Sequence, residues 1–460
     1  MDIKESDRVK ELKHKSRRLS IKGGIFSSMK ESFGGNYLSP FAIAINSSNS
    51  LVAMLNSIQG LLGPLSQLYG SKLIEKTSRK KVVIRSVFFE SLIWLPLMAI
   101  AFLFYKEIIT GFLPLFLLIF FSIYIILANV SHPAWFSWMG DIVDEKYRGR
   151  WFSKRNLFIE TFSLIFAVSS AFFLDYFKKT ENVMIGFIIL FLLAFLSRLT
   201  CWRIFRKQYN PKIKISKKDY FSFGEFLKKA PSTNFGKFAI FRALLNFSMA
   251  IYSSVLAIFL LRNLQLNYLH YIIIIFSATV FSLIVTEIWG KITDKYGNYF
   301  VLVITTIFIP IIPLIWILSP SLAYLILIPG IIRGVFWTGF NLATVNFIYD
   351  NVRNQKRGLA VSYFNMLSGI GIFLGATTSA ILIKYLHIGK IEPVSAIFIF
   401  SSLLSMLVVF FGITQIREIK KKKKMSGIKD FETFVVKQAK PTLLEEAHEI
   451  ISVKKYFNKP

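Results

Sequence analysis

The chain has 460 residues, of which 54% are hydrophobic and 47 are phenylalanine, and its formal net charge is +30. With a mean hydropathy of +0.52, this composition excludes an ordinary water-soluble globular protein. The single cysteine, Cys201, excludes a disulfide framework and a zinc cluster, and no metal or cofactor is expected. Apolar residues come in blocks of about 20, the length of helix that crosses a bilayer core of about 30 Å. We therefore expect a polytopic helical membrane protein.

Eleven apolar blocks predict transmembrane spans, at residues 48–69, 82–104, 111–133, 154–176, 183–204, 236–261, 267–289, 299–318, 322–348, 359–383 and 393–414. Hydropathy alone does not decide the stretch 23–45, which contains charged residues and several glycines. Lysine and arginine collect in cytoplasmic loops, and there are seven in residues 1–20 and five in 70–81. Both segments are cytoplasmic only if 23–45 also crosses the membrane. This gives twelve spans with both termini in the cytoplasm.

The predicted architecture is an all-α membrane protein with twelve transmembrane helices. Its parts are a basic cytoplasmic N-terminal segment (1–22), an N-terminal six-helix bundle (23–204), a cytoplasmic connector with an amphipathic helix (205–235), a C-terminal six-helix bundle (236–415) and a basic cytoplasmic tail (416–460). The apolar face of FSFGEFLKKA in the connector is expected on the membrane surface. The positive charge then sets the orientation of the chain in the membrane. Its expected partner is anionic lipid at the cytoplasmic face, and no nucleic-acid partner is expected.

Loops at equivalent positions of the two halves resemble each other. GDIVDEKYRGRWFSKRN follows span 4 and YDNVRNQKRGLAVSYFN follows span 10, and they share Asp-x6-Arg-Gly-x6-Asn. A second pair aligns SKLIEKTSRKK, after span 2, with GKITDKYGN, after span 8, so that Glu75 corresponds to Asp294. The halves are therefore expected to be two pseudo-symmetric six-helix bundles.

The second copy of this loop contains the motif G-x-x-x-D-[RK]-x-G at Gly290, Asp294, Lys295 and Gly297. Together with the Arg-Gly pairs after spans 4 and 10, it resembles the major facilitator superfamily (MFS) of transporters over residues 20–415. The last basic position of the family motif is Asn298 here, whereas Arg79 and Lys80 occupy it in the first copy.

The resemblance implies the MFS fold, in which two bundles rock about a central site and a loop acid clamps the cytoplasmic face when it is closed. A carboxylate near a helix N-terminus gains roughly 0.3–1 kcal/mol, which suits such a clamp. The residues expected at this cytoplasmic gate are Gly290, Asp294, Lys295, Gly297, Glu75, Arg79, Asp141, Arg148, Gly149, Asp350, Arg357 and Gly358. The alternative is that they are interfacial charges that only set topology.

Polar side chains inside spans are costly and mark candidate functional sites. The substrate or coupling candidates are Arg333, Lys30, Glu31, Asn36, Glu160, Glu90, His132, Trp337 and Asn341. Arg333 is foremost because it lies roughly 16 Å from one end of span 10. It would bind an anionic group, or it would form a structural ion pair.

Several candidates also have a second interpretation. Lys30 could snorkel to the interface, and it is expected on a different helix face from its neighbour Glu31. Glu90 and Glu160 could carry a proton, although Glu90 could equally pair with Arg85 or Lys81. His132, near the outer end of span 4, could sense pH or form an interfacial hydrogen bond. The resemblance implies that spans 1, 4, 7 and 10 line the cavity and that spans 3, 6, 9 and 12 are peripheral. Spans 6, 9 and 12 are almost continuously apolar, in agreement with this expectation.

These patterns favour a secondary transporter, not an enzyme, that moves a small organic solute by rocker-switch alternating access, with proton coupling as one option. GxxxxGK[ST] is absent from the sequence, which disfavours an ATP-driven pump. The alternatives are a membrane-embedded enzyme acting on a lipid-linked substrate and a transporter-like receptor or scaffold. A monomer in the cell membrane is expected. The sequence leaves the substrate and the direction of transport open.

Overall fold

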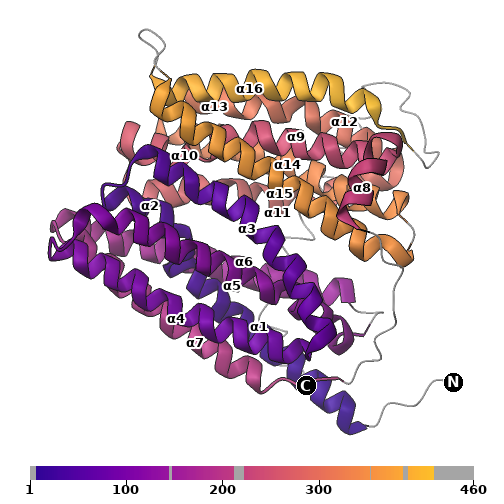
Figure 1. Ribbon diagram of the computed structural model, residues 1–460, viewed down its shortest axis with the longest axis horizontal. Coiled ribbons are helices and arrows are strands. Elements are labelled where there is room, and N and C mark those ends of the chain that lie inside the picture. The colour runs from indigo at the N-terminus through magenta and orange to yellow at the C-terminus, as the bar shows by residue number, and fades with distance from the viewer. Residues whose placement is uncertain (1–6, 145–147, 212–221, 353, 387–391, 419–460) are drawn as a thin grey trace. The chain divides into compact units, whose positions relative to one another are not determined.

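The computed structural model describes residues 7–144, 148–211, 222–352, 354–386 and 392–418. All regular elements among these residues are helical (Figure 1). The long helices of the first half are α1 (Asp7–Phe33), α3 (Asn49–Lys76), α4 (Arg79–Tyr105), α5 (Leu113–Ile142), α6 (Arg148–Lys179) and α7 (Val183–Arg206). Those of the second half are α9 (Asn234–Ser253), α11 (Tyr268–Tyr296), α12 (Asn298–Phe308), α14 (Leu322–Asn351), α15 (Asn354–Tyr385) and α16 (Pro393–Gly412).

Ten helical stretches in the described part of the chain are long and apolar enough to cross a membrane. They match ten of the predicted spans, which confirms an all-α membrane protein. The two other predicted spans are also helical, as α3 and as the succession of α1, a 3-10 turn η1 (Gly35–Tyr37) and α2 (Leu38–Ala44). Helices therefore occupy all twelve predicted segments.

Glycine allows close packing directly after the end of α1. A side chain at Gly34 would overlap the indole ring of Trp94, which is fully buried. The close approach of Trp94 therefore requires glycine at this position. Prolines interrupt another span, where η6 (Ile309–Ile311) and α13 (Ile312–Ile317) follow α12 at Pro310 and Pro313.

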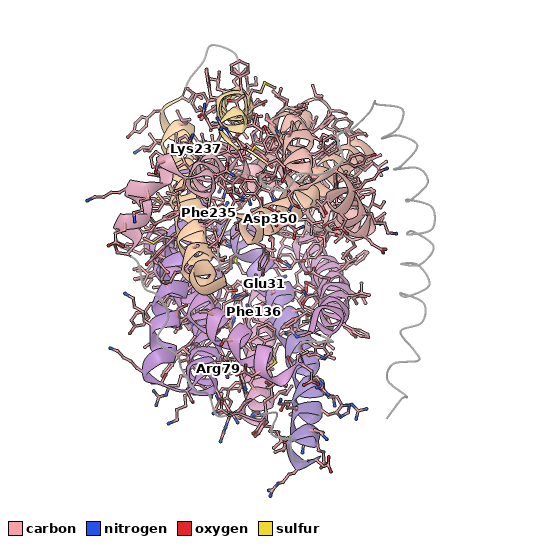
Figure 2. The ribbon with its side chains drawn as sticks, turned by 90° about the vertical axis from the view of Figure 1, so that its right-hand side faces the viewer. Glu31, Arg79, Phe136, Phe235, Lys237 and Asp350 are labelled. Atoms are coloured by element: carbon pink, nitrogen blue, oxygen red, sulfur yellow. The ribbon has the colours of Figure 1, made fainter. Side chains whose placement is uncertain are left out.

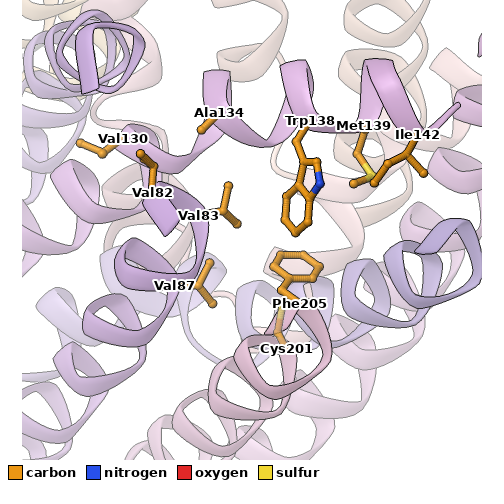
Figure 3. Close-up of a cluster of buried hydrophobic side chains, with 10 residues drawn as sticks. All are labelled: Val82, Val83, Val87, Val130, Ala134, Trp138, Met139, Ile142, Cys201 and Phe205. Atoms are coloured by element: carbon orange, nitrogen blue, oxygen red, sulfur yellow. The ribbon is translucent and has the colours of Figure 1, made fainter. Parts of the chain in front are cut away.

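The chain forms two compact units. The first comprises residues 1–217, 250–272 and 369–394, and the second comprises residues 218–249, 273–368 and 395–460. In the first unit, α4 packs against α5 and α7, α3 packs against α5, and α1 packs against α6 and α7 (Figure 1). Figure 3 shows one core of this unit, where Trp138 of α5, Val83 of α4 and Phe205 of α7 meet.

In the second unit, α12 packs against α14, and α11 meets α14 at small residues. A side chain at Gly334 would lie 2.6 Å from the carbonyl oxygen of Ala278, so glycine lets these two helices approach closely. The connector helix α8 (Phe223–Lys229) begins with a capping box of Ser222 and Glu225. On its apolar face, Phe223 and Phe226 pack against Tyr363 of the same unit.

Candidate functional site

A cluster of ionised side chains lies inside the first unit. Lys30 of α1 lies 2.7 Å from Glu31 Oε2 and 3.2 Å from Glu90 Oε1 of α4. Arg198 of α7 pairs with the other oxygen of Glu90. Tyr124 of α5 accepts a hydrogen bond from Lys30 at 3.0 Å and donates one to Glu31 at 3.0 Å. We call Lys30, Glu31, Glu90, Tyr124 and Arg198 the charge cluster.

The charge cluster is balanced, with two cations and two carboxylates. Glu90 is fully buried, and the Lys30 and Arg198 side chains are only 7% exposed, whereas the Glu31 side chain is 44% exposed. Glu31 is therefore the member that a solute or proton can reach, and Figure 2 shows it among the helices of the first unit. Buried charges are tolerated when they are paired and hydrogen-bonded. A change in charge at Glu31 would unbalance the remaining members.

Two expectations for this region are wrong. Glu90 pairs with Arg198 and Lys30, not with Arg85 or Lys81, because these two partners reach it from neighbouring helices inside the bundle. Lys30 and Glu31 do not act on separate faces, since the long lysine side chain brings its ammonium group back to the Glu31 carboxylate. Neither Arg198 nor Tyr124 was a candidate in the sequence. An arginine within the apolar block 183–204 was the signal that could have found Arg198.

A different polar group occupies the second unit. The guanidinium of Arg242, on α9, lies over the rings of Phe340 at 4.6 Å and Trp337 at 5.2 Å. Its Nη2 atom donates to Asn341 Oδ1 at 3.1 Å. Two predicted residues of α14, Trp337 and Asn341, thus converge on an arginine that sequence analysis missed. Arg333 is half-buried on α14 and forms no hydrogen bond or ion pair within the described residues.

The remaining substrate candidates, as far as the structure describes them, form no hydrogen bond or ion pair with either group. Asn36 is half-buried in the 3-10 turn after α1, and its amide nitrogen finds no partner among the described residues. Glu160 is exposed on α6. His132 is exposed on α5, which continues to Ile142, so its expected position near a helix end is wrong. The described residues contain no group of side chains that could hold a metal ion.

The loops of the predicted gate contain a contact at the equivalent position in both halves. In the first unit, Arg79 pairs with Asp141 and also donates to the carbonyl oxygen of Ser137 at 2.6 Å. Figure 2 labels Arg79. In the second unit, Asn298 donates to Asp350 Oδ2 at 2.7 Å. Arg79 and Asn298 hold equivalent positions of the repeat, as do Asp141 and Asp350. The repeat in the sequence therefore corresponds to an equivalent side-chain contact in each unit.

The loop between α11 and α12 turns at Gly297, whose φ of 96° favours glycine. An exposed Asp294 lines a pocket of about 210 Å³ in the second unit, together with Asn298, Asp350 and Glu418. Glu418 accepts a hydrogen bond from the first turn of α12 at Tyr299 N, 2.9 Å away. Gly290 faces open space, and Lys295 lies 4.8 Å from the ring of Tyr296. The side chains of Glu75, Arg148, Gly149, Arg357 and Gly358 lie outside the described residues.

The first unit also joins segments that are far apart in sequence. Ser57 of α3 lies 2.7 Å from Thr377 Oγ1 of α15. The carboxylate of Asp175, on α6, accepts hydrogen bonds from Tyr268 N and Leu269 N at the start of α11, at 2.8 and 2.9 Å. Helices α3 and α15 approach at Gly60 and Gly369, where a side chain on Gly369 would overlap the Gly60 carbonyl. We call Ser57–Thr377, Asp175–α11 and Gly60–Gly369 the cross-half contacts, because each joins segments of the two sequence halves.

Comparison with known proteins places these features in a family context. The sequence profile described as Major Facilitator Superfamily matches residues 22–376 and 238–457. A search of curated proteins gives no sequence match.

Among solved structures, the nucleoside transporter NupG has a TM-score of 0.64 at 14% identity, over 88% of this chain and 98% of that one. A bacterial homologue of the iron transporter ferroportin, in its inward-facing state, has a TM-score of 0.64 at 16% identity, over 87% and 98%. An auto-inhibited POT family peptide transporter has a TM-score of 0.67 at 11% identity, over 90% and 99%. These likenesses support a shared fold.

Proposed function

Because the chain belongs to the major facilitator superfamily and is a multi-pass membrane transporter, we propose that it moves a small organic solute through a coupling site formed by the charge cluster. The cluster is the observation that carries this proposal. Four charged side chains meet inside a bundle of apolar helices, where isolated charges are costly. Transport, not catalysis, is the activity that this arrangement serves.

Glu31 is the member through which coupling would act. Its side chain is the exposed one of the cluster, and it shares Lys30 with Glu90. A proton on Glu31 removes one negative charge, so Lys30 then depends on Glu90 alone. This change favours a different arrangement of α1 against α4 and α7. Two arrangements that differ in charge are what a proton-coupled secondary transporter needs.

Alternating access requires contacts that hold one end of the molecule and then release it. The cross-half contacts support this proposal because they join segments of the two sequence halves by a few hydrogen bonds and one close glycine crossing. Each hydrogen bond contributes about 0.5–1.5 kcal/mol, so their sum suits a gate that opens reversibly. We propose that Asp294, Asp141, Asp350 and their loop partners form the cytoplasmic gate.

The orientation follows from the lysine and arginine distribution. Basic residues concentrate in 1–20 and 70–81, and nine more lie in 203–230, which supports cytoplasmic termini and a basic face against anionic lipid. We propose that the protein acts as a monomer in the cell membrane, and that the positive charge has no nucleic-acid partner.

Flux measurements in proteoliposomes test this function. A solute panel is first screened for uptake without ATP, and each hit is then measured with and without a pH gradient. Glu31→Gln should abolish the response to the gradient while solute exchange at equal pH continues. Glu181→Gln is the matched control, because Glu181 is an exposed carboxylate of the same unit that is neither a coupling candidate nor a member of the cluster. Uptake that needs ATP, or an unchanged gradient response in Glu31→Gln, would contradict the proposal.

A further inference from the structure

We propose that Arg242 forms an anion-binding subsite and that the transported solute is an organic anion, bound through a carboxylate or phosphate group. This inference rests on the proposed transport function and adds the class of solute. It concerns a group on α9 and α14 of the second unit that is separate from the charge cluster.

The contacts of Arg242 hold its guanidinium without satisfying it. Two aromatic rings, those of Phe340 and Trp337, lie against it, and Asn341 accepts one hydrogen bond from Nη2. The Nε and Nη1 atoms are buried and have no hydrogen-bond partner within the described residues. The aromatic rings fix the plane of the guanidinium. Its donors are therefore positioned in advance for an acceptor that is not part of this unit's described side chains.

The charge of Arg242 is also unmatched. In the charge cluster, two cations meet two carboxylates, whereas the described residues give Arg242 only the neutral amide of Asn341. An unpaired buried cation is unfavourable because it has lost water without gaining a counter-charge. A carboxylate or phosphate solute supplies that charge and accepts from the free donors, since arginine binds both groups with its planar fork.

The depth of Arg242 points to a solute and not to an interfacial ion. Asn234, at the start of α9, donates to Asn351 Oδ1 at the end of α14 at 2.9 Å, so these helix ends lie together. Arg242 is eight residues into α9 and Asn341 is ten residues before the end of α14, which places them about 12 Å and about 15 Å from that shared end. Asn341 is exposed at this depth, and polar side chains within membrane spans as a rule face the bundle interior or a water-filled cavity.

Arg333 provides the comparison that isolates this subsite. It lies on the same helix, α14, and carries the same guanidinium. It is half-buried, yet none of the described residues gives it an aromatic platform or an amide partner. If charge alone selected anions, both arginines would serve. The preorganised contacts assign the role to Arg242.

Binding to the purified full chain in lipid nanodiscs tests the subsite. The probes are three acids, each with a neutral counterpart: benzoate with benzamide, succinate with succinamide, and phenyl phosphate with phenol. Thermal shift is measured for the native chain, Arg242→Gln, Arg242→Lys and Arg333→Gln. We expect at least one acid to stabilise the native chain and its neutral counterpart not to. In Arg242→Gln the apparent affinity should fall by about tenfold to a hundredfold, the loss expected for charge-assisted hydrogen bonds.

Arg242→Lys should retain part of the affinity, because it keeps the charge and loses the planar fork. Arg333→Gln should bind like the native chain. The proposal is overturned if no acid stabilises the native chain, if acids and neutral counterparts act alike, or if Arg242→Gln binds the acid unchanged. Uptake of a neutral solute without Arg242-dependent acid binding would overturn this inference alone. Arg242-dependent binding without any flux would instead overturn the proposed transport and leave the subsite standing.

Discussion

Asn298 hydrogen-bonds to Asp350 in the second unit at the position where Arg79 pairs with Asp141 in the first. The four residues are related by the internal repeat, and both contacts link the loop after an even-numbered span to the end of the helix two spans later. The first copy is an ion pair and the second is an amide–carboxylate hydrogen bond. The two halves therefore hold equivalent loops by different chemistry.

Arg at position 298 should recreate the stronger contact. We expect Asn298→Arg to stabilise the protein by about 0.5–1 kcal/mol, because an ion pair with Asp350 replaces a neutral donor. Asn298→Ala should destabilise it by about 1 kcal/mol, since Asp350 loses that hydrogen bond. Thermal melting of both variants in detergent measures the difference. Equal melting temperatures for the two variants would show that this contact contributes nothing.

Among the members of the charge cluster, Glu90 should tolerate substitution least. Glu90→Gln leaves Arg198 without its carboxylate and Lys30 with only Glu31, so we expect a loss of about 3–5 kcal/mol. Adding Arg198→Gln should recover part of the loss, because one unpaired charge is then removed. A double-mutant cycle by chemical denaturation gives the coupling between the two residues. If the losses in the free energy of unfolding of the two single variants simply added in the double variant, the pairing of Glu90 with Arg198 would be contradicted.

Arg242 should lower the stability of the ligand-free protein. Replacing an unpaired buried charge by an apolar side chain of similar volume is often stabilising by about 1–4 kcal/mol, so Arg242→Met should melt at a higher temperature than the native chain. Arg198→Met should melt lower, because it removes a paired charge and leaves Glu90 with Lys30 alone. Melting curves without added ligand distinguish the two arginines. A loss of stability in Arg242→Met would indicate a structural role.

A side chain at Gly369 should not fit where α3 and α15 cross. Gly369→Ala places a methyl group on the Gly60 carbonyl, so we expect lower stability and slower solute flux. Gly140→Ala is the matched control, since a side chain there meets open space and alanine favours the helix by about 1 kcal/mol over glycine. Flux and melting temperature are measured for both. Native behaviour of Gly369→Ala would mean that the crossing can widen.

Asp175 should act both as a helix cap and as a cross-half contact. Asp175→Ala removes acceptors from the first turn of α11 and should destabilise the protein by about 0.5–2 kcal/mol. Asn267→Ala is the control, because Asn267 caps the same helix at His270 N, 2.7 Å away, without involving α6. Only Asp175→Ala should increase thiol labelling of a Ser57→Cys reporter in a Cys201→Ser background. Equal labelling in both variants would leave Asp175 as a cap only.

The spans were predictable because hydropathy in blocks of about 20 residues is a local property. The loop repeat was predictable for the same reason, since Asp141 and Asp350 keep a fixed spacing from an Arg-Gly pair. Charge pairing was not predictable, because it depends on which helices lie side by side. Glu90 has nearby basic residues in its own helix, yet it pairs with Arg198, 108 residues away.

Two arginines were not among the candidates, because polar residues were considered chiefly in the spans expected to line the cavity. Arg198 lies in a span that was read as peripheral, and Arg242 lies near the start of an apolar block, where snorkelling explains most basic residues. Trp337 and Asn341 were candidates, but a single sequence does not indicate that they meet an arginine of another helix. Their relationship appears only when α9 and α14 are packed together.

The tight packing of Trp94 against Gly34 gives the molecule its own optical reporter. The indole ring is fully buried, and its centroid lies 5.3 Å from that of Tyr124, whose hydroxyl belongs to the charge cluster. Fluorescence of this tryptophan should therefore respond when Tyr124 or its neighbours move. A chain that keeps Trp94 and replaces the other tryptophans by phenylalanine would reveal events at the cluster by its emission, without an attached dye.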